Sequence, residues 1–250
     1  MTSNNIARLS VLVVRIVKYV FLSLGILTLL LGMFVTWIYF SVFAGPDPFD
    51  ISEFHPFKSP KAKLEYLAFE DDMKRSWPVV SEERLVATSQ GQTFMRISGP
   101  PQAPPLLLLP GGGSNSLIWH ANIGELSKSY RTYALDNIYD YGRSIYTQRI
   151  TDGEDYAAWL NELSDTLGLG DEIRVMGYSF GGWVASQYAV YHPGRIQKLV
   201  LVAPVYTILP LTNEYILKMV QTLIPIRYFK KKIMYWVWAD LAKMGDSGKI

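Results

Sequence analysis

The chain has 250 residues, 49% of them hydrophobic and 14% aromatic, which is enough to bury the core of one large domain or two small ones. Its 24 basic and 22 acidic residues leave a formal net charge of +2, so the composition argues against nucleic acid as a partner. The sequence contains no cysteine, and this excludes disulfides, zinc–thiolate sites and a cysteine nucleophile.

The first predicted element is a membrane-spanning helix. Residues 19–45 carry no charged side chain, and the run exceeds the roughly 20 apolar residues that cross a bilayer. Aromatic residues, which favour the membrane–water interface, stand near both of its ends: Tyr19, Phe21, Trp37, Tyr39 and Phe40. The alternatives are a cleaved signal peptide, whose apolar core is usually only about 7–15 residues long, and a buried helix of a soluble fold. A run of this length without a polar face argues against the buried helix.

The charges on either side of this run predict its orientation. Three basic residues precede it, namely Arg8, Arg15 and Lys18, and three acidic residues follow it, namely Asp47, Asp50 and Glu53. Positive charge favours the cytoplasmic side of a membrane. We therefore expect residues 1–18 in the cytoplasm, one membrane span, and everything after Gly45 on the extracytoplasmic side.

Residues 46–82 are predicted to form a linker with one helix. The segment is rich in Pro, Asp and Phe up to Pro60 and reads as irregular structure. Ser59 suits the N-cap of a helix and Pro60 its first turn, and the helix is expected to end before Pro78. We expect this helix to pack against the rest of the chain rather than to carry chemistry.

Residues 83–205 alternate between predicted strands and helices. Two short strands, 83–88 and 93–97, are joined by residues 89–92, which are predicted to form a hairpin turn. Leu106–Leu109 is a continuous apolar run typical of a strand buried on both faces. Beyond it the order is helix 116–127, strand 130–135, helix 156–167, strand 173–176, helix 180–191 and strand 199–203. This alternation predicts an α/β fold, with a mostly parallel sheet and helices on both faces.

The strongest motif is Gly177-Tyr178-Ser179-Phe180-Gly181, which lies between a predicted strand and a predicted helix. The pattern G-x-S-x-G in this position is typical of a nucleophile elbow, a sharp turn that exposes the serine hydroxyl. Glycines two residues before and after the serine remove side chains that would collide there. Ser179 is thus the candidate catalytic nucleophile, and an ordinary glycine-rich turn is the alternative.

A second glycine-rich segment, Gly111-Gly112-Gly113, follows the buried strand. A loop in this position supplies one N–H group to an oxyanion hole, and the residue after the nucleophile, Phe180, supplies the other. We expect Gly112 to be the loop donor, with Gly111 or Gly113 as alternatives one position away. A nucleotide-binding loop is disfavoured because neither Gly-Lys-Ser/Thr nor G-x-G-x-x-G is present.

Residues 83–205 resemble the α/β-hydrolase superfamily in its esterase-like branch. The stretch LLLLPGGGSNSLIWHANIGELSKSYRTYALDNIYDYGRS is similar to the family's oxyanion strand and the strand and Asp-rich loop that follow, and RVMGYSFGGWVASQYAVYHPGRIQKLVLVAPV to its elbow, helix and next strand. The family usually has His-Gly where this chain has Pro110-Gly111, a change that keeps the backbone donors. The resemblance implies a serine hydrolase that cleaves small-molecule carboxylic esters or similar acyl bonds through an acyl-enzyme at Ser179. It implies no cofactor and no metal.

The resemblance also implies an acid and a histidine after the nucleophile, in that order, and neither is visible. His192 follows Ser179 but stands at the far end of the predicted helix, roughly 20 Å away. His120, early in the helix after the glycine loop, is placed to border a pocket, but we expect a surface or supporting role. His55 is expected to be a solvated linker residue.

The simplest expectation is therefore a hydrolase truncated at its carboxyl terminus, inside a partial cap formed by residues 206–250. Helices 215–223 and 228–241 are predicted there, and we favour a substrate lid over a helix resting on an anionic membrane. The main rival function is a catalytically incomplete remnant, or a membrane-bound interaction module. A haloalkane-type or epoxide-type hydrolase needs Asp at the elbow, which Ser179 contradicts. Nothing in the sequence indicates an oligomeric state.

Overall fold

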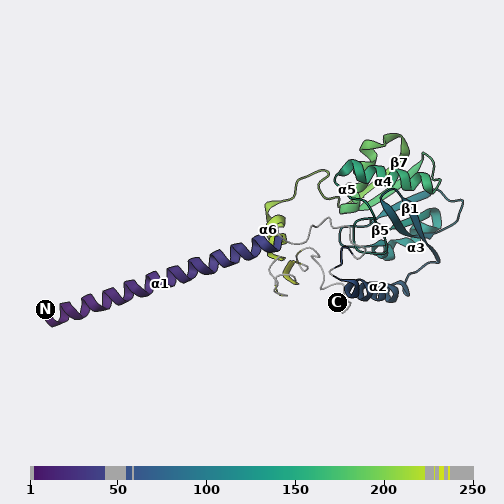
Figure 1. Ribbon diagram of the computed structural model, residues 1–250. Helices are drawn as coiled ribbons and strands as arrows, with labels where there is room; N and C mark the ends of the chain where they lie inside the picture. Colours follow the sequence, from purple (N-terminus) through teal and green to yellow (C-terminus); the bar gives the residue numbers. More distant parts are fainter. Residues whose placement is uncertain are drawn as a thin grey trace. The chain divides into compact units, whose positions relative to one another are not determined.

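The computed structural model describes residues 3–42, 55–57, 59–222, 228, 231–233 and 236. The chain divides into two compact units, Met1–Asp50 and Ile51–Ile250 (Figure 1). The first unit is one helix, and the second holds the sheet and the remaining helices.

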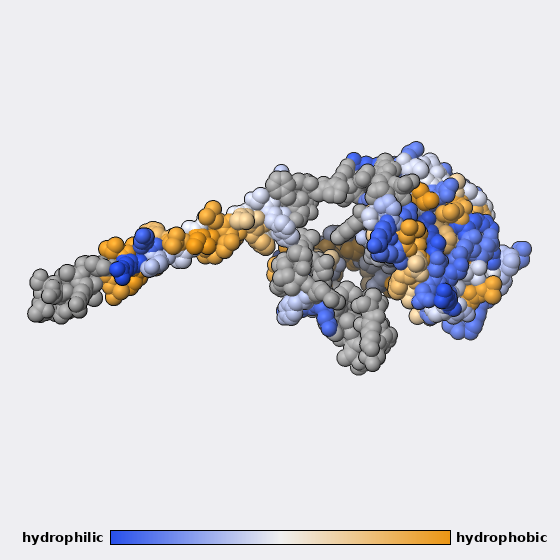
Figure 2. Space-filling view, turned by 60° about the horizontal axis from the view of Figure 1, so that its bottom comes forward, coloured by the Kyte–Doolittle hydropathy of each residue, from blue (hydrophilic) through white to orange (hydrophobic). Residues whose placement is uncertain are grey.

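The first unit is the helix α1 (Ser3–Val42), which starts well before the apolar run identified in the sequence. Its segment Leu12–Trp37 is long and apolar enough to cross a membrane, and none of it is buried. A signal sequence near an amino terminus passes the same test of length and composition. Figure 2 shows hydrophobic side chains along much of this helix.

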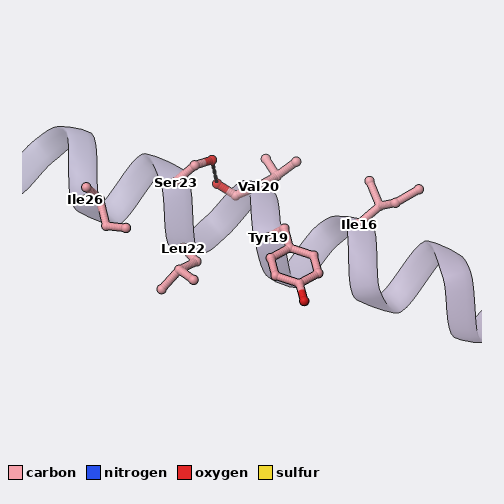
Figure 3. Close-up of a pocket in the computed structure, with 6 residues that line it drawn as sticks. All are labelled: Ile16, Tyr19, Val20, Leu22, Ser23 and Ile26. Carbon is pink, nitrogen blue, oxygen red and sulfur yellow. Dashed lines mark hydrogen bonds between the residues drawn. The ribbon is translucent and has the colours of Figure 1, made fainter.

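Polar side chains within the apolar segment are satisfied by the helix itself. Ser23 Oγ donates a hydrogen bond to the carbonyl oxygen of Val20 at 2.9 Å, and Thr28 Oγ1 donates to that of Leu24 at 2.9 Å. A shallow hollow along the same stretch is lined by side chains of this one helix, among them Ile16, Tyr19 and Ile26 (Figure 3). It is a groove between neighbouring side chains rather than an enclosed cavity.

The second unit begins with helix α2 (Pro60–Lys74). Ser59 is its N-cap, since Ser59 Oγ accepts a hydrogen bond from the Ala62 N–H at 3.2 Å, and Pro60 occupies the first turn, as the sequence predicts. The helix ends at Lys74, a few residues before Pro78.

The sheet of the second unit has seven strands in the described residues. They are β1 (Ser81–Thr88), β2 (Gly91–Ser98), β3 (Pro105–Leu109), β4 (Arg131–Leu135), β5 (Ile145–Tyr146), β6 (Ile173–Tyr178) and β7 (Ile196–Val202). Their order is β1-β2-β4-β3-β6-β7, with β5 beside β2. The pairs β4–β3, β3–β6 and β6–β7 are parallel, whereas β2 pairs antiparallel with β1, β4 and β5. The predicted mostly parallel sheet is confirmed.

Helices cover both faces of this sheet, as predicted. The remaining elements are the 3₁₀ turns η1 (Ser116–Trp119) and η2 (Pro193–Arg195) and the helices α3 (His120–Ser129), α4 (Gly153–Thr166), α5 (Phe180–Tyr191) and α6 (Asn213–Thr222). Leu107 and Leu109 of β3 pack with residues of α4 and α5, whereas Leu106 and Leu108 pack with Trp119 of η1 and Ile123 of α3. The alternation of side chains along a strand therefore explains why this run is apolar throughout.

An internal ion-pair network fastens α2 to the sheet. The side chain of Arg96 on β2 is fully buried, and its Nη2 donates to Glu70 Oε1 of α2 at 2.6 Å. Arg143, in the loop after β4, also reaches α2, because its Nε lies 3.2 Å from Glu70 Oε1 and its Nη2 2.5 Å from Asp71 Oδ1. Glu83 of β1 pairs with Arg96 as well. The packed role expected for α2 is thus confirmed.

Strand β7 pairs with β6 and is the last strand on that side of the sheet within the described residues. Leu199, Val200 and Val202 keep 36%, 43% and 40% of their surface exposed, unlike the buried leucines of β3. After β7 the predicted helix 215–223 is observed as α6. Most of the predicted helix 228–241 lies outside the described residues.

Candidate active site

Ser179 occupies the sharp turn between β6 and α5. Its backbone has φ 52° and ψ −114°, in a region that non-glycine residues rarely adopt. The turn is held by hydrogen bonds on both sides of the peptide unit. The Ser179 N–H donates to the carbonyl oxygen of Val202 at 2.9 Å, and the Ser179 carbonyl oxygen accepts from the N–H groups of Gly182, Trp183 and Val205 at 3.0 to 3.2 Å. The elbow geometry thus agrees with the prediction from the motif.

The glycines around Ser179 are there for close packing of backbone on backbone. A side chain at Gly177 would collide with the carbonyl group of Gly181. A side chain at Gly181 would collide with the carbonyl groups of Leu109 and Pro110, at the end of β3. The elbow therefore lies directly against the start of the glycine loop.

The loop of Gly111 to Gly113 and the elbow meet. A Cβ atom on Gly111 would lie 3.3 Å from the Ser179 Cβ, and one on Gly112 would lie 3.5 Å from the Phe180 Cβ. The structure thus brings together Ser179, Gly112 and Phe180, the three residues predicted for the site. Because Phe180 is the first residue of α5, its N–H has no acceptor within the helix and is available to a ligand.

Three polar residues of the loop after β4 form hydrogen bonds to the glycine loop and to the residues that flank it, and no motif in the sequence points to them. Asp140 Oδ2 accepts a hydrogen bond from the Gly113 N–H at 2.7 Å. Asn137 Nδ2 donates to the Pro110 carbonyl oxygen at 3.3 Å, and Asp136 Oδ1 accepts from the Ser116 N–H at 2.8 Å. Their place in the sequence could have pointed to them, because they directly follow strand β4. Parallel neighbours such as β3 and β4 end at the same edge of a sheet, so the segments after them meet.

Burial shifts the titration of both acids in this loop. It raises the pKa of the Asp140 carboxyl above its ordinary value, with the N–H groups of Tyr141 and Gly113 acting in the opposite direction. It also raises the pKa of Asp136, which is buried beneath the loop and bonded by Arg143 and Ser116. Two partly desolvated acids therefore stand beside the glycine loop.

Aromatic rings surround Phe180. Its ring stacks on that of Trp183 with the centroids 5.4 Å apart, and the ring of Tyr156 from α4 meets both edge-on at 5.5 and 5.7 Å. Burial raises the pKa of the Tyr156 hydroxyl. An apolar wall of this kind lowers the local dielectric, which strengthens hydrogen bonds to a developing negative charge.

The three histidines of the sequence lie in the described residues, and none is hydrogen-bonded to Ser179. His120 is bound to the end of α2, where its Nε2 lies 2.7 Å from the Ser76 carbonyl oxygen, which agrees with a supporting role. His192 lies at the far end of α5, roughly 20 Å from Ser179 at 1.5 Å per residue.

The expectation of a solvated His55 is wrong. This side chain is half-buried, with its ring 5.4 Å from that of Tyr139 and 5.2 Å from that of Tyr146. Aromatic packing against residues far along the chain explains the difference, since local sequence does not display such contacts. Among the described residues, no group of three acidic or histidine side chains is placed to hold a metal ion.

Comparison with known proteins supports the α/β-hydrolase fold. The family model for the alpha/beta hydrolase fold matches residues 104–232. An uncharacterized carboxylesterase of Bacillus subtilis, nap, is 36% identical over 139 residues, which cover 56% of this chain and 46% of that protein. Carboxylesterase YbfK of the same organism is 34% identical over 148 residues, covering 59% of this chain and 50% of that protein.

Solved structures agree with these matches. The crystal structure of naproxen esterase (carboxylesterase NP) from Bacillus subtilis superposes with a TM-score of 0.62 at 32% identity, covering 66% of this chain and 57% of that one. The chain spans about half the length of the curated relatives it matches.

Proposed function

The chain belongs to the α/β-hydrolase fold family, and from this premise we propose that it hydrolyses small-molecule carboxylic esters, or related acyl bonds, through an acyl-enzyme at Ser179. The observation that carries the proposal is the convergence of the strained Ser179 with Gly112 and Phe180 at one edge of the sheet. The carboxylesterase names of two relatives support an ester substrate.

The reaction divides into two acyl transfers. In the first, Ser179 Oγ attacks the carbonyl carbon of the ester while its proton passes to a base. The carbonyl oxygen then carries the negative charge, and the N–H groups of Phe180 and Gly112 donate to it. The amino terminus of α5 adds the favourable end of its dipole. Collapse of this intermediate expels the alcohol, which takes up the proton, and water later releases the acid by the reverse sequence.

A catalytically incomplete domain is the second candidate function. The observation that favours it is the lack of a histidine bonded to Ser179 within the described residues. Without a base, a serine hydroxyl is a weak nucleophile at neutral pH.

We further propose that α1 anchors the protein in a membrane as a single span, with the amino terminus in the cytoplasm. Its apolar segment and the preceding basic residues support this orientation. The proposed division of the chain is a cytoplasmic end 1–18, the span 19–45, a linker and helix 46–82, a hydrolase core 83–205 and a partial cap 206–250.

The test of the proposed reaction is labelling of the full chain in detergent with a fluorophosphonate probe. We expect labelling of the wild-type protein and none in Ser179→Ala. The matched control is Ser186→Ala on the same helix, whose Oγ only donates to the Trp183 carbonyl oxygen, and it should label like the wild type. Release of p-nitrophenol from a short-chain p-nitrophenyl ester then measures turnover.

Two results contradict the proposal. Equal labelling of wild type and Ser179→Ala means that another residue reacts. No labelling of a wild-type protein that is folded by circular dichroism favours the catalytically incomplete domain.

A further inference from the structure

Resting on the proposed function, we propose that Asp140 is a positioning residue whose carboxylate holds the glycine loop so that the Gly112 N–H faces the acyl group on Ser179. Asp140 does not touch the reacting atoms in this assignment. It acts through the backbone of its neighbour Gly113.

The contacts of Asp140 fix its carboxylate from two sides. Oδ2 accepts from the Gly113 N–H at 2.7 Å, and Oδ1 accepts from the N–H of Tyr141, its own neighbour, at 2.7 Å. The hydrogen bond to Gly113 joins residues 27 positions apart in the sequence. An ionised acceptor makes such a bond shorter and about twice as strong as a neutral one.

The glycine loop has a defined shape that depends on this bond. Gly113 has φ +73°, a left-handed conformation that lets the chain turn back. On the other side of Gly112, the Gly111 carbonyl oxygen accepts from Ser114 Oγ at 2.7 Å and from the Ser114 N–H at 3.2 Å. Both neighbours of Gly112, namely Gly111 and Gly113, are therefore fixed by hydrogen bonds. Their positions set the direction of the Gly112 N–H.

The position of Asp140 relative to the site is equally defined. Its Oδ2 lies 4.0 Å from the point where a Cβ atom on Gly112 would stand, and the same point is 3.5 Å from the Phe180 Cβ. The carboxylate thus lies beside Gly112 and is bonded to Gly113 rather than to Gly112. This arrangement leaves the Gly112 N–H free to donate to a substrate oxygen.

The charge on Asp140 responds to its surroundings. Burial raises the pKa of this carboxyl, and Asp136 of the same loop raises it further. Tyr156 of α4 and Tyr66 of α2 also face it, and Asn137 donates to it. As the pH falls through this raised pKa, the carboxylate becomes a carboxylic acid and loses acceptor capacity. The reactivity of Ser179 should then fall at a milder acidity than an exposed aspartate would produce.

The test compares fluorophosphonate labelling rates of the full chain in detergent. Asp140→Ala should label at least tenfold more slowly, because loss of one well-placed oxyanion donor costs about 10²–10³ in rate and misorientation costs part of that. Asp155→Ala is the matched control, since Asp155 Oδ2 also accepts two hydrogen bonds, from the N–H and Oγ1 of Thr151, at the start of α4. We expect it to label within about twofold of the wild type.

Two further readouts separate positioning from folding. Asp140→Asn keeps one acceptor oxygen and does not titrate, so it should recover part of the labelling rate. The contribution of Asp140 to the acid limb of the pH profile should disappear in this variant. Hydrogen exchange at the Gly113 amide needs no reactive serine, and it should be faster in Asp140→Ala but unchanged in Asp155→Ala.

The outcomes distinguish this inference from the proposed function. If the wild type fails to label, the proposed function fails, and exchange at Gly113 alone decides whether Asp140 holds the loop. Unchanged exchange in Asp140→Ala, or faster exchange with an unchanged labelling rate, overturns the inference. Equal losses in Asp140→Ala and Asp155→Ala overturn it as well, because a general effect on folding then explains them.

Discussion

At Ser179 the backbone adopts a conformation that costs about 1–3 kcal/mol for a residue with a side chain. The four hydrogen bonds that surround its peptide unit come from β7, from α5 and from the segment after β7. Because these partners belong to different elements, the strained conformation of Ser179 is stable only when those elements are packed together. The glycines of the elbow are part of that support, because they let α5 approach the end of β3.

Gly181→Ala tests this dependence. The new methyl group would collide with the carbonyl groups of Leu109 and Pro110, and we expect the free energy of unfolding to fall by about 3 kcal/mol. Urea denaturation of the full chain in detergent, followed by tryptophan fluorescence, measures it. The control is Gly124→Ala in α3, where a Cβ atom meets nothing within 4 Å, and it should stabilise by about 0.5–1 kcal/mol. Similar changes in both variants would contradict the close packing at the elbow.

The residues that sequence alone could identify at this site are those whose role is local. Ser179, Gly112 and Phe180 follow from short motifs placed at the ends of two strands. Asp140 could not be found in that way, because its partner Gly113 is far along the chain and the two meet only once β3 and β4 pair. His55 was misjudged for the same reason, since its aromatic neighbours are distant in the chain, Tyr139 in the loop after β4 and Tyr146 in β5.

Among the elements, α2 shows how a peripheral helix is joined to the site. Glu70 on α2 binds both Arg96 and Arg143, and the Arg143 N–H donates to Asp136 Oδ2 at 2.8 Å. Asp136 in turn accepts from Ser116, directly after the glycine loop. A short chain of hydrogen bonds thus runs from α2 to the loop that lies against Ser179.

Glu70→Ala should disrupt this connection. It leaves the buried guanidinium of Arg96 without its partner on α2, and removing one member of a buried ion pair costs about 3–5 kcal/mol. Denaturant unfolding of the full chain in detergent is the measurement. Lys61→Ala serves as the control, because Lys61 and Glu65 on the same helix form an exposed pair at 3.8 Å that contributes less than about 1 kcal/mol. A loss below about 1 kcal/mol in Glu70→Ala would show that the network does not hold α2.

The order of the strands and helices along the chain could be predicted from the sequence. The positions of the strands within the sheet could be predicted only in part. Hydrophobic periodicity and turn residues located nearly every strand and helix, including the capped start of α2. The two-residue strand β5 was missed because Ile145 and Tyr146 are too short a run to show a period. The turn at residues 89–92 predicts the antiparallel hairpin of β1 and β2, and the structure confirms it. The antiparallel pairing of β2 with β4 depends on contacts across the chain, which no local pattern contains.

At the scale of the whole molecule, the role proposed for α1 is to anchor the protein in a membrane. Its exposed apolar segment supports an uncleaved anchor, and Leu31 stands near the middle of the proposed span 19–45. Leu31→Arg places a charge at the centre of the span, which costs roughly 3 kcal/mol of insertion free energy. We expect this variant to be released from membranes by carbonate to a greater extent than the wild type.

The matched control for this experiment is Leu64→Arg on α2, an exposed position outside the apolar segment. It should remain in the membrane fraction with the wild type. Release of the wild-type protein by carbonate, or a mass showing that the first residues have been removed, contradicts the anchor and favours a cleaved signal sequence.

Within the described residues, β1 stands at one end of the sheet, and three consecutive charged side chains on it are exposed, those of Glu82, Glu83 and Arg84. An incoming strand would have to remove water from these charges before it could pair with β1. Strand β1 is therefore a poor template for the strand of another molecule, and association that extends the sheet beyond β1 should be disfavoured.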